Sequence, residues 1–116
     1  MKKLLIAAAI AAALVMIPAK VGANTVRDDG NEWLNKCNEG TSGYEMWCLG
    51  YTQSLSHGYD ILTSYSKTDL YCPGNRLVSI GQLRDIMRNY LYRNPAKRSD
   101  KMMLVYIEAM RESYPC

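Results

Sequence analysis

The sequence has few of the residues that enzymes and metal sites commonly use. It contains a single histidine, His57, and no motif supplies a partner that would orient it as a general base. Its four cysteines form no Cys-x-x-Cys pair, which argues against a zinc site. A glycine-rich phosphate-binding loop is also missing. The sequence therefore predicts a protein that is not an enzyme and that needs no cofactor, with His57 a polar residue at the rim of a helix.

Hydrophobic residues form only one long run, from Leu4 to Ile17, directly after a short basic segment. This run is too short to span a bilayer comfortably, and the small residues of Val21-Gly22-Ala23 suit a signal peptidase. We predict that residues 1–23 are a cleaved signal peptide and that residues 24–116 form one periplasmic domain that no longer contacts the membrane. The alternative is an uncleaved anchor, which Pro18 disfavours because it interrupts the run.

The predicted mature chain has no excess of charge of either sign. The whole sequence carries a formal net charge of +3, from 14 basic and 11 acidic residues. Lys2, Lys3 and Lys20 account for all of this excess, so the chain without them has eleven residues of each sign. A neutral chain gives no reason to expect binding to nucleic acid or to an anionic membrane.

All four cysteines, Cys37, Cys48, Cys72 and Cys116, lie in the predicted mature chain. An even number in a small exported protein is typical of a disulfide framework. Of the three possible pairings we favour Cys37–Cys48 and Cys72–Cys116. The first would close the short turn between two helices, and the second would tie the C-terminus to a mid-chain loop.

Hydrophobic spacing predicts an all-α fold, a small domain of four helices and short helical turns stapled by the two disulfides, and no stretch alternates as a strand would. The central helix is expected from Ser42 to Ser66, capped by Thr41 or Ser42. Its apolar residues recur every three or four positions and so share a buried face: Cys48, Tyr51, Leu55, Tyr59 and Leu62. Beside them, a stripe of small residues would admit another helix closely: Gly50, Ser54 and Gly58.

A short helix is predicted before the central one. It would begin at an Asn31 N-cap and end near Gly40. The polar segment from Asn24 to Asp29 is expected to be frayed, with the carboxylates of Asp28 and Asp29 solvated.

Two helices are predicted after the central one. The first opens with a capping box of the S-x-x-Q kind at Ser79 and Gln82 and ends near Asn94-Pro95. The second runs from about Ser99 to Ser113. Its buried stripe is predicted to hold Met102, Val105, Tyr106, Ala109, Met110 and Ser113.

The aromatic residues are nine tyrosines and two tryptophans, with no phenylalanine. Tyrosine combines apolar area with a hydroxyl and is favoured where a surface is buried in a partner. Helical spacing favours a core position for four of them: Tyr51, Tyr59, Tyr90 and Tyr106. The loop from Lys67 to Leu77 has its turn at Pro73-Gly74-Asn75. Tyr65, just before this loop, and Tyr71, ahead of the turn, are the better interface candidates.

An ordered set of short motifs resembles the Rap/Tai family of immunity proteins. The motifs are Cys48-Leu49-Gly50-Tyr51, Gly58, Cys72-Pro73, Ser79-Ile80-Gly81-Gln82-Leu83, Tyr90-Leu91, Asn94-Pro95 and Tyr114-Pro115-Cys116. The similarity covers about residues 31–116. Members are small, mostly helical periplasmic proteins that protect bacteria from type VI secretion effectors, of which peptidoglycan amidases are the best known. The resemblance implies an inhibitor that is not an enzyme and that forms a homodimer.

We therefore expect an immunity protein that binds one periplasm-directed effector, an amidase by resemblance, and occludes its active site. Candidate contact residues lie on the loop after the central helix and on the basic turn around Lys97: Tyr65, Lys67, Asp69, Tyr71, Asn75, Arg76, Arg93 and Arg98. An acid-stress periplasmic chaperone is the alternative, since such chaperones are also small, helical and disulfide-bonded. A chaperone activated by acid would need carboxylates at an interface, whereas this chain has balanced charge.

Overall fold

The computed structural model describes residues 28–116, and in this part of the chain all regular secondary structure is helical, without a β-sheet. In chain order the helices are α2 (Gly30–Cys37), α3 (Ser42–Ser66), α4 (Ile80–Arg93), the 3₁₀ helix η1 (Pro95–Ser99) and α5 (Met102–Ser113). The predicted all-α domain of four α-helices is confirmed. The predicted signal peptide lies outside the described residues.

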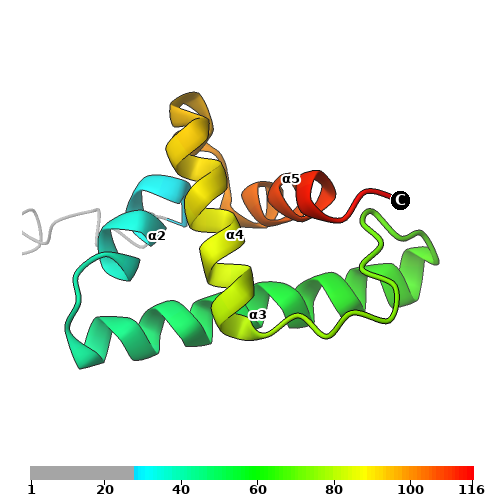
Figure 1. The fold of residues 1–116 in the computed structure, drawn as a ribbon, viewed down its shortest axis with the longest axis horizontal. Helices are drawn as coiled ribbons and strands as arrows, with labels where there is room; N and C mark the ends of the chain where they lie inside the picture. The colour runs from blue at the N-terminus through cyan, green and yellow to red at the C-terminus, as the bar shows by residue number, and fades with distance from the viewer. Residues whose placement is uncertain (1–27) are drawn as a thin grey trace, which may run out of the picture.

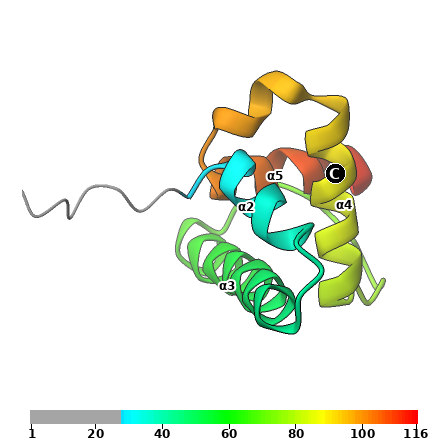
Figure 2. The same ribbon diagram turned by 90° about the vertical axis from the view of Figure 1, so that its left-hand side faces the viewer.

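The long helix α3 forms the base on which the other helices pack. Figure 1 shows α4 crossing α3 while α5 runs roughly along it, and Figure 2 shows α2, α4 and α5 all on the same side of α3. Every α-helix contributes side chains to one hydrophobic core, whose largest fully buried members include Trp33, Met87, Leu91, Met102, Tyr106 and Met110. The fold therefore has a single core above α3.

The buried face of α3 agrees with the predicted spacing except at its end. Cys48, Leu55 and Tyr59 are buried, Tyr51 is half-buried, and Leu62 is 46% exposed, so the prediction for Leu62 is wrong. The chain after α3 folds back over the side of the helix that carries Thr63, which leaves Leu62 uncovered. The N-cap of α3 is Thr41, as predicted, although its side chain makes no capping hydrogen bond.

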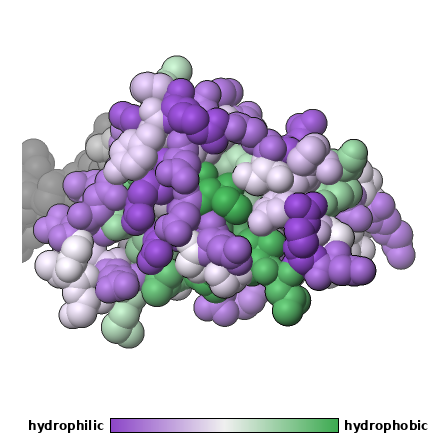
Figure 3. All heavy atoms as spheres, in the orientation of Figure 1, coloured by the Kyte–Doolittle hydropathy of each residue, from purple (hydrophilic) through white to green (hydrophobic). Residues whose placement is uncertain are grey.

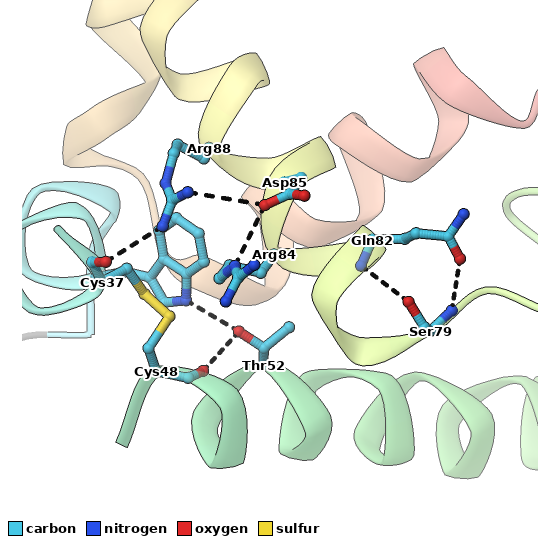
Figure 4. Close-up of polar contacts among 9 residues, drawn as sticks. Cys37, Cys48, Thr52, Ser79, Gln82, Arg84, Asp85 and Arg88 are labelled. Carbon is cyan, nitrogen blue, oxygen red and sulfur yellow. Dashed lines mark hydrogen bonds and ion pairs between the residues drawn. A yellow bond between two sulfur atoms is a disulfide. The ribbon is translucent and has the colours of Figure 1, made fainter. Parts of the chain in front are cut away.

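Thr52 completes the buried stripe of α3, and sequence spacing did not predict it. Its hydroxyl accepts a hydrogen bond from Trp33 Nε1 at 3.3 Å and donates one to the Cys48 carbonyl at 2.7 Å (Figure 4). A buried hydroxyl is tolerated only when it is paired in this way. Thr52 therefore links α2 to α3.

The predicted stripe of small residues is correct only at Gly58. A Cβ atom there would lie 3.0 Å from Met103 Cε, so α5 does pack closely at this point. Gly50 has no neighbouring atom within 4 Å of that position, and Ser54 is exposed. Because α5 begins only at Met102, its side chains reach the second half of α3 and not the first.

The first described helix begins earlier than predicted. Its N-cap is Asp29, whose Oδ1 accepts a hydrogen bond from Glu32 N at 2.9 Å, and not Asn31. Gly30 fixes this start, because a Cβ atom there would lie 2.9 Å from Leu91 Cδ2 and 3.0 Å from the Arg98 backbone. Only glycine permits such an approach.

The predicted fraying is wrong for Asp28 and Asp29, although the Asp28 side chain stays 43% exposed, in line with the predicted solvation. Asp28 accepts a backbone hydrogen bond from Met102 N at 2.9 Å, and its carboxylate pairs with Lys101 Nζ at 2.7 Å. Asp29 forms an antiparallel bridge with Lys101. The start of α2 is therefore tied to the start of α5, while residues 24–27 lie outside the described part of the chain.

The capping box at the start of α4 is confirmed (Figure 4). Ser79 Oγ accepts from Gln82 N at 3.1 Å, and Gln82 Oε1 accepts from Ser79 N at 2.8 Å. The helix ends at Arg93, one residue before Asn94, as predicted.

The last helix begins at Met102, three residues later than predicted. The chain before it forms η1 and then two extended residues, Asp100 and Lys101. The Asp100 carbonyl accepts a hydrogen bond from Gly30 N at 3.2 Å, which keeps this segment out of the helix. The buried stripe is otherwise correct, but Ser113 is exposed.

Both predicted disulfides are present. Cys37 and Cys48 close the turn between α2 and α3 (Figure 4), and Cys72 joins Cys116 across 44 positions of the sequence. In a domain this small, such crosslinks supply stability that a modest core cannot.

Candidate functional site

The segment between α3 and α4, residues 67–79, has no regular secondary structure and is called here the α3–α4 loop. It starts with a sharp change of direction at Lys67, whose φ of 55° lies in the left-handed region. The Lys67 amide donates to the Thr63 carbonyl at 2.8 Å, which closes the last turn of α3. Figure 1 shows the loop turning back beside the end of α3 before it reaches α4.

Three tyrosines from three parts of the chain hold the middle of this loop. The Tyr59 hydroxyl on α3 accepts hydrogen bonds from the backbone amides of Leu70 at 2.8 Å and Tyr71 at 3.3 Å. The Tyr71 ring stacks on Tyr59 with centroids 4.4 Å apart, and its hydroxyl pairs with that of Tyr106 at 2.6 Å. We call Tyr59, Tyr71 and Tyr106 the tyrosine cluster.

Tyr71 is thus a core residue, and the prediction that it lies on an exposed interface is wrong. Only 8% of it is exposed, because the loop folds inward and places its ring between α3 and α5. Burial raises the pKa of Tyr71 and of Tyr106 above the usual tyrosine value. The predicted core positions of Tyr59, Tyr90 and Tyr106 are confirmed, while Tyr51 is half-buried.

The disulfide holds the loop immediately after the tyrosine cluster. Cys72 is bonded to Cys116, and the Cys72 amide also donates to the Tyr114 carbonyl at 2.8 Å. The loop is therefore joined to the segment that follows α5 by a covalent bond and by a hydrogen bond.

The turn at Pro73-Gly74-Asn75 is stabilised from within the loop. Gly74 has a φ of +64°, a conformation that glycine adopts without strain. Arg76 bonds the Pro73 carbonyl through its amide at 3.3 Å and through Nε at 2.9 Å. Its guanidinium also lies 4.7 Å from the centre of the Tyr114 ring. The loop thus has one ordered course from end to end.

Several side chains of this loop and of the last turn of α3 are exposed, and of these Arg76 also holds the turn through its guanidinium. Tyr65 is 86% exposed and Leu77 is 97% exposed. We call the exposed group the loop surface: Tyr65, Lys67, Asp69, Asn75, Arg76 and Leu77. In the view of Figure 3, hydrophobic surface gathers near the middle of the molecule, between more hydrophilic regions.

Leu77 was not among the residues predicted from the sequence. The signal that could have identified it is the neighbouring Val78, which packs against the core just before the Ser79 cap. Since Val78 takes the inward position, Leu77 is an apolar residue in a polar loop with no place in the core. Isolated exposed leucines are common, so its place on a loop whose backbone is held by the tyrosine cluster and the disulfide is what makes it a candidate.

The basic side chains of the predicted turn after α4 are engaged in contacts within the molecule, which leaves them less free to bind a partner. Arg93 pairs with Glu112, and Lys97 Nζ lies 3.5 Å from Glu108 Oε2. Arg98 is half-buried and donates from Nε to the Leu91 carbonyl at 2.8 Å. These residues lie at the end of α4 and on η1, away from α3 in Figure 1, and their charges already have partners.

A groove of about 820 Å³ lies between the loop, α4 and α5. Its walls carry both signs of charge, with Asp69 and Glu108 opposed by Lys97 and Arg111. The Tyr90 hydroxyl donates to Glu108 Oε2 at 2.5 Å, and burial together with this carboxylate raises the pKa of Tyr90 to about 12. The groove is open and polar, and none of its lining residues forms a nucleophile with an adjacent base.

Within residues 28–116, no three histidine, cysteine, aspartate or glutamate side chains are grouped so that they could hold a metal ion. None of the helices in that range combines the length and the hydrophobicity that a bilayer crossing needs. His57 is exposed on α3.

Comparison with known proteins identifies the family to which this fold is similar. A family model described as Rap1a immunity proteins matches residues 29–116, which is almost the whole described fold. No curated protein and no solved structure matches the chain.

Proposed function

The chain belongs to the family of Rap1a immunity proteins, and we propose that it binds one cognate type VI secretion effector in the periplasm and inhibits it. Proteins of such families act by binding and are generally not enzymes. We propose further that the effector is a peptidoglycan amidase, the class that the resemblance implies, and that the loop surface occludes its active site.

One observation supports the loop surface most directly: the backbone of the α3–α4 loop is held by the fold, and yet Tyr65 and Leu77 beside and on it are almost fully exposed. The tyrosine cluster and the Cys72–Cys116 bond restrain its backbone, so little conformational entropy is lost when it binds. Tyr65 and Leu77 provide exposed apolar area for a partner to bury. Order and exposure together are what an inhibitory contact requires.

The side chains of the loop surface indicate what kind of effector surface would bind to it. Tyrosine and arginine are the types that most often become binding hot spots, and both occur here as Tyr65 and Arg76. Lys67 and Asp69 add one charge of each sign to the same surface. The matching effector surface has apolar recesses for Tyr65 and Leu77 and polar groups for the charged side chains.

The proposal is tested with the double variant Tyr65→Ala with Leu77→Ala and the effector encoded by the neighbouring gene, carrying an inactivating substitution. We expect affinity to fall by about thirtyfold or more, the equivalent of one hot spot of about 2 kcal/mol. The thermal midpoint should not change, because both side chains are exposed. Isothermal titration calorimetry gives the affinity, and rescue of cells that make the active effector in the periplasm gives the function.

Met46→Ala is the matched control, because Met46 is 75% exposed on the first turns of the same helix. It should bind the effector as tightly as wild type. If Arg93→Ala with Arg98→Ala abolishes rescue while the loop variant rescues fully, the contact lies on the turn after α4. If wild type neither binds nor neutralises the effector, the immunity proposal fails and the acid-stress chaperone remains. Sedimentation of the same preparation tests the homodimer that the resemblance implies.

A further inference from the structure

Tyr59 lies on α3 and belongs to the core, yet its hydroxyl contacts the α3–α4 loop and nothing on the loop surface. We infer that Tyr59 is a positioning residue for effector binding, whose hydroxyl sets the direction in which the loop leaves the tyrosine cluster. This inference rests on the proposed function, because it concerns how the same loop surface is presented.

The backbone amides of the loop explain why a hydroxyl is needed at this point. A buried N–H group requires an acceptor, and a segment without helix or strand has few of its own. Leu70 is half-buried and Tyr71 is buried, and the amides of both donate to the one Tyr59 oxygen. Phenylalanine would keep the ring and its stacking on Tyr71 but would leave both amides without this acceptor.

The attachments of the loop have different effects on its geometry. The Cys72–Cys116 bond and the hydrogen bond from the Cys72 amide to the Tyr114 carbonyl both act at a single residue of the loop. Hydrogen bonds from two consecutive amides, just before Cys72, fix the direction of the backbone as well. Asp69 on one side and the turn at Gly74 on the other then have defined places. Without the hydroxyl, the Tyr71 ring and the bonds at Cys72 would still hold the loop, but the backbone at Leu70 and Tyr71 would lose its acceptor, and the residues before Cys72 would no longer be held in one direction.

Thr52→Val provides a matched control for a change that only weakens the fold. Thr52 is also a buried α3 residue, and its hydroxyl also makes two hydrogen bonds, to Trp33 and to the Cys48 carbonyl. It contacts α2 and not the loop. Tyr59→Phe and Thr52→Val therefore each remove two hydrogen bonds of a buried hydroxyl on the same helix, and only the first pair reaches the loop.

The experiment compares wild type, Tyr59→Phe, Thr52→Val and the double variant of Tyr65 and Leu77. It measures effector affinity by calorimetry, the thermal midpoint, and exchange of the Leu70 and Tyr71 amides by NMR in the free protein. For Tyr59→Phe we expect both amides to exchange about tenfold faster or more. We also expect its affinity to fall about tenfold, because the loop must be ordered on binding. Thr52→Val should lower the thermal midpoint and leave affinity and the two amides unchanged.

Unchanged exchange of the two amides in Tyr59→Phe would overturn the inference, whatever the effector result. Equal losses of affinity in Tyr59→Phe and Thr52→Val would also overturn it, since the effect would then be one of stability alone. A failure of the proposed function looks different: the variant of Tyr65 and Leu77 would bind like wild type, while the amide exchange would still report whether Tyr59 holds the loop.

Discussion

Removal of the Cys72–Cys116 disulfide should destabilise the protein more than removal of the Cys37–Cys48 disulfide. The bonded residues are 44 positions apart in the first pair and 11 in the second. In the chain-entropy model these separations correspond to about 4 and about 3 kcal/mol of stabilisation. Each bond lowers the entropy of the unfolded chain, and the loss grows with the logarithm of the number of residues in the closed loop.

The expected loss is a large fraction of the total stability. The free energy of unfolding of small domains is about 5 to 15 kcal/mol, so losing about 4 kcal/mol would leave the fold only marginally stable. The hydrogen bond from the Cys72 amide to the Tyr114 carbonyl and the tyrosine cluster remain, and we therefore expect Cys72→Ser with Cys116→Ser to fold at low temperature.

Urea unfolding followed by circular dichroism measures both double serine variants against wild type. The urea concentration at the unfolding midpoint should fall by about 2 to 4 M in the Cys72 variant and by somewhat less in the Cys37 variant. A loss below about 1 kcal/mol for the Cys72 variant would refute the argument from chain entropy. So would a clearly larger loss for the Cys37 variant, which would mean that the local turn between α2 and α3 matters more than loop length.

Two further predictions concern a helix start and alkaline pH. Ser79→Ala removes the acceptor for the Gln82 amide and should cost about 1 kcal/mol in urea unfolding, whereas Ser79→Asn, which can still cap the helix, should cost only a few tenths. Because the folded-state pKa of Tyr90 is raised to about 12, the folded protein holds a proton that the unfolded chain releases above about pH 10, so stability present below pH 10 should be lost as the pH rises through 12. Between about pH 9 and about pH 11.5, the thermal midpoint should fall less in Tyr90→Phe than in wild type. An equal fall in both proteins would contradict the assignment of this effect to Tyr90.

The features that could be predicted from the sequence are local ones. The capping box at Ser79 needs only residues that are three apart, and the buried stripe of α3 needs only its own spacing. The disulfide pairing could also be inferred, since each bond joins segments that the predicted helices bring to the same end.

The features that could not be predicted depend on contacts between distant segments. Asp29 and Asn31 are both suitable N-caps, and the choice between them is made by Gly30 fitting against Arg98. Tyr71 stands in a polar loop without periodicity, so its inward orientation depends on an acceptor and a stacking partner that α3 provides.

Prediction of the candidate surface was limited in the same way, by contacts between distant segments. In the sequence the basic turn has no nearby acidic partners for Arg93 and Lys97, because Glu112 and Glu108 are on α5. Leu77 could be recognised as exposed only once Val78 was seen to occupy the inward position. Spacing along one helix carries no information about either relation.

In the α3–α4 loop, different residues hold the backbone and face the solvent, and this has a consequence for how the protein could change its target. Tyr71 and Cys72 determine the course of the loop through inward contacts, while Asp69, Asn75 and Leu77 contribute exposed side chains to it. Substitutions at the exposed positions cost little folding free energy. They can therefore accumulate in any order without passing through an unfolded intermediate. The same scaffold could in this way acquire a new recognition sequence, by natural drift or by library selection, while its backbone stays as it is.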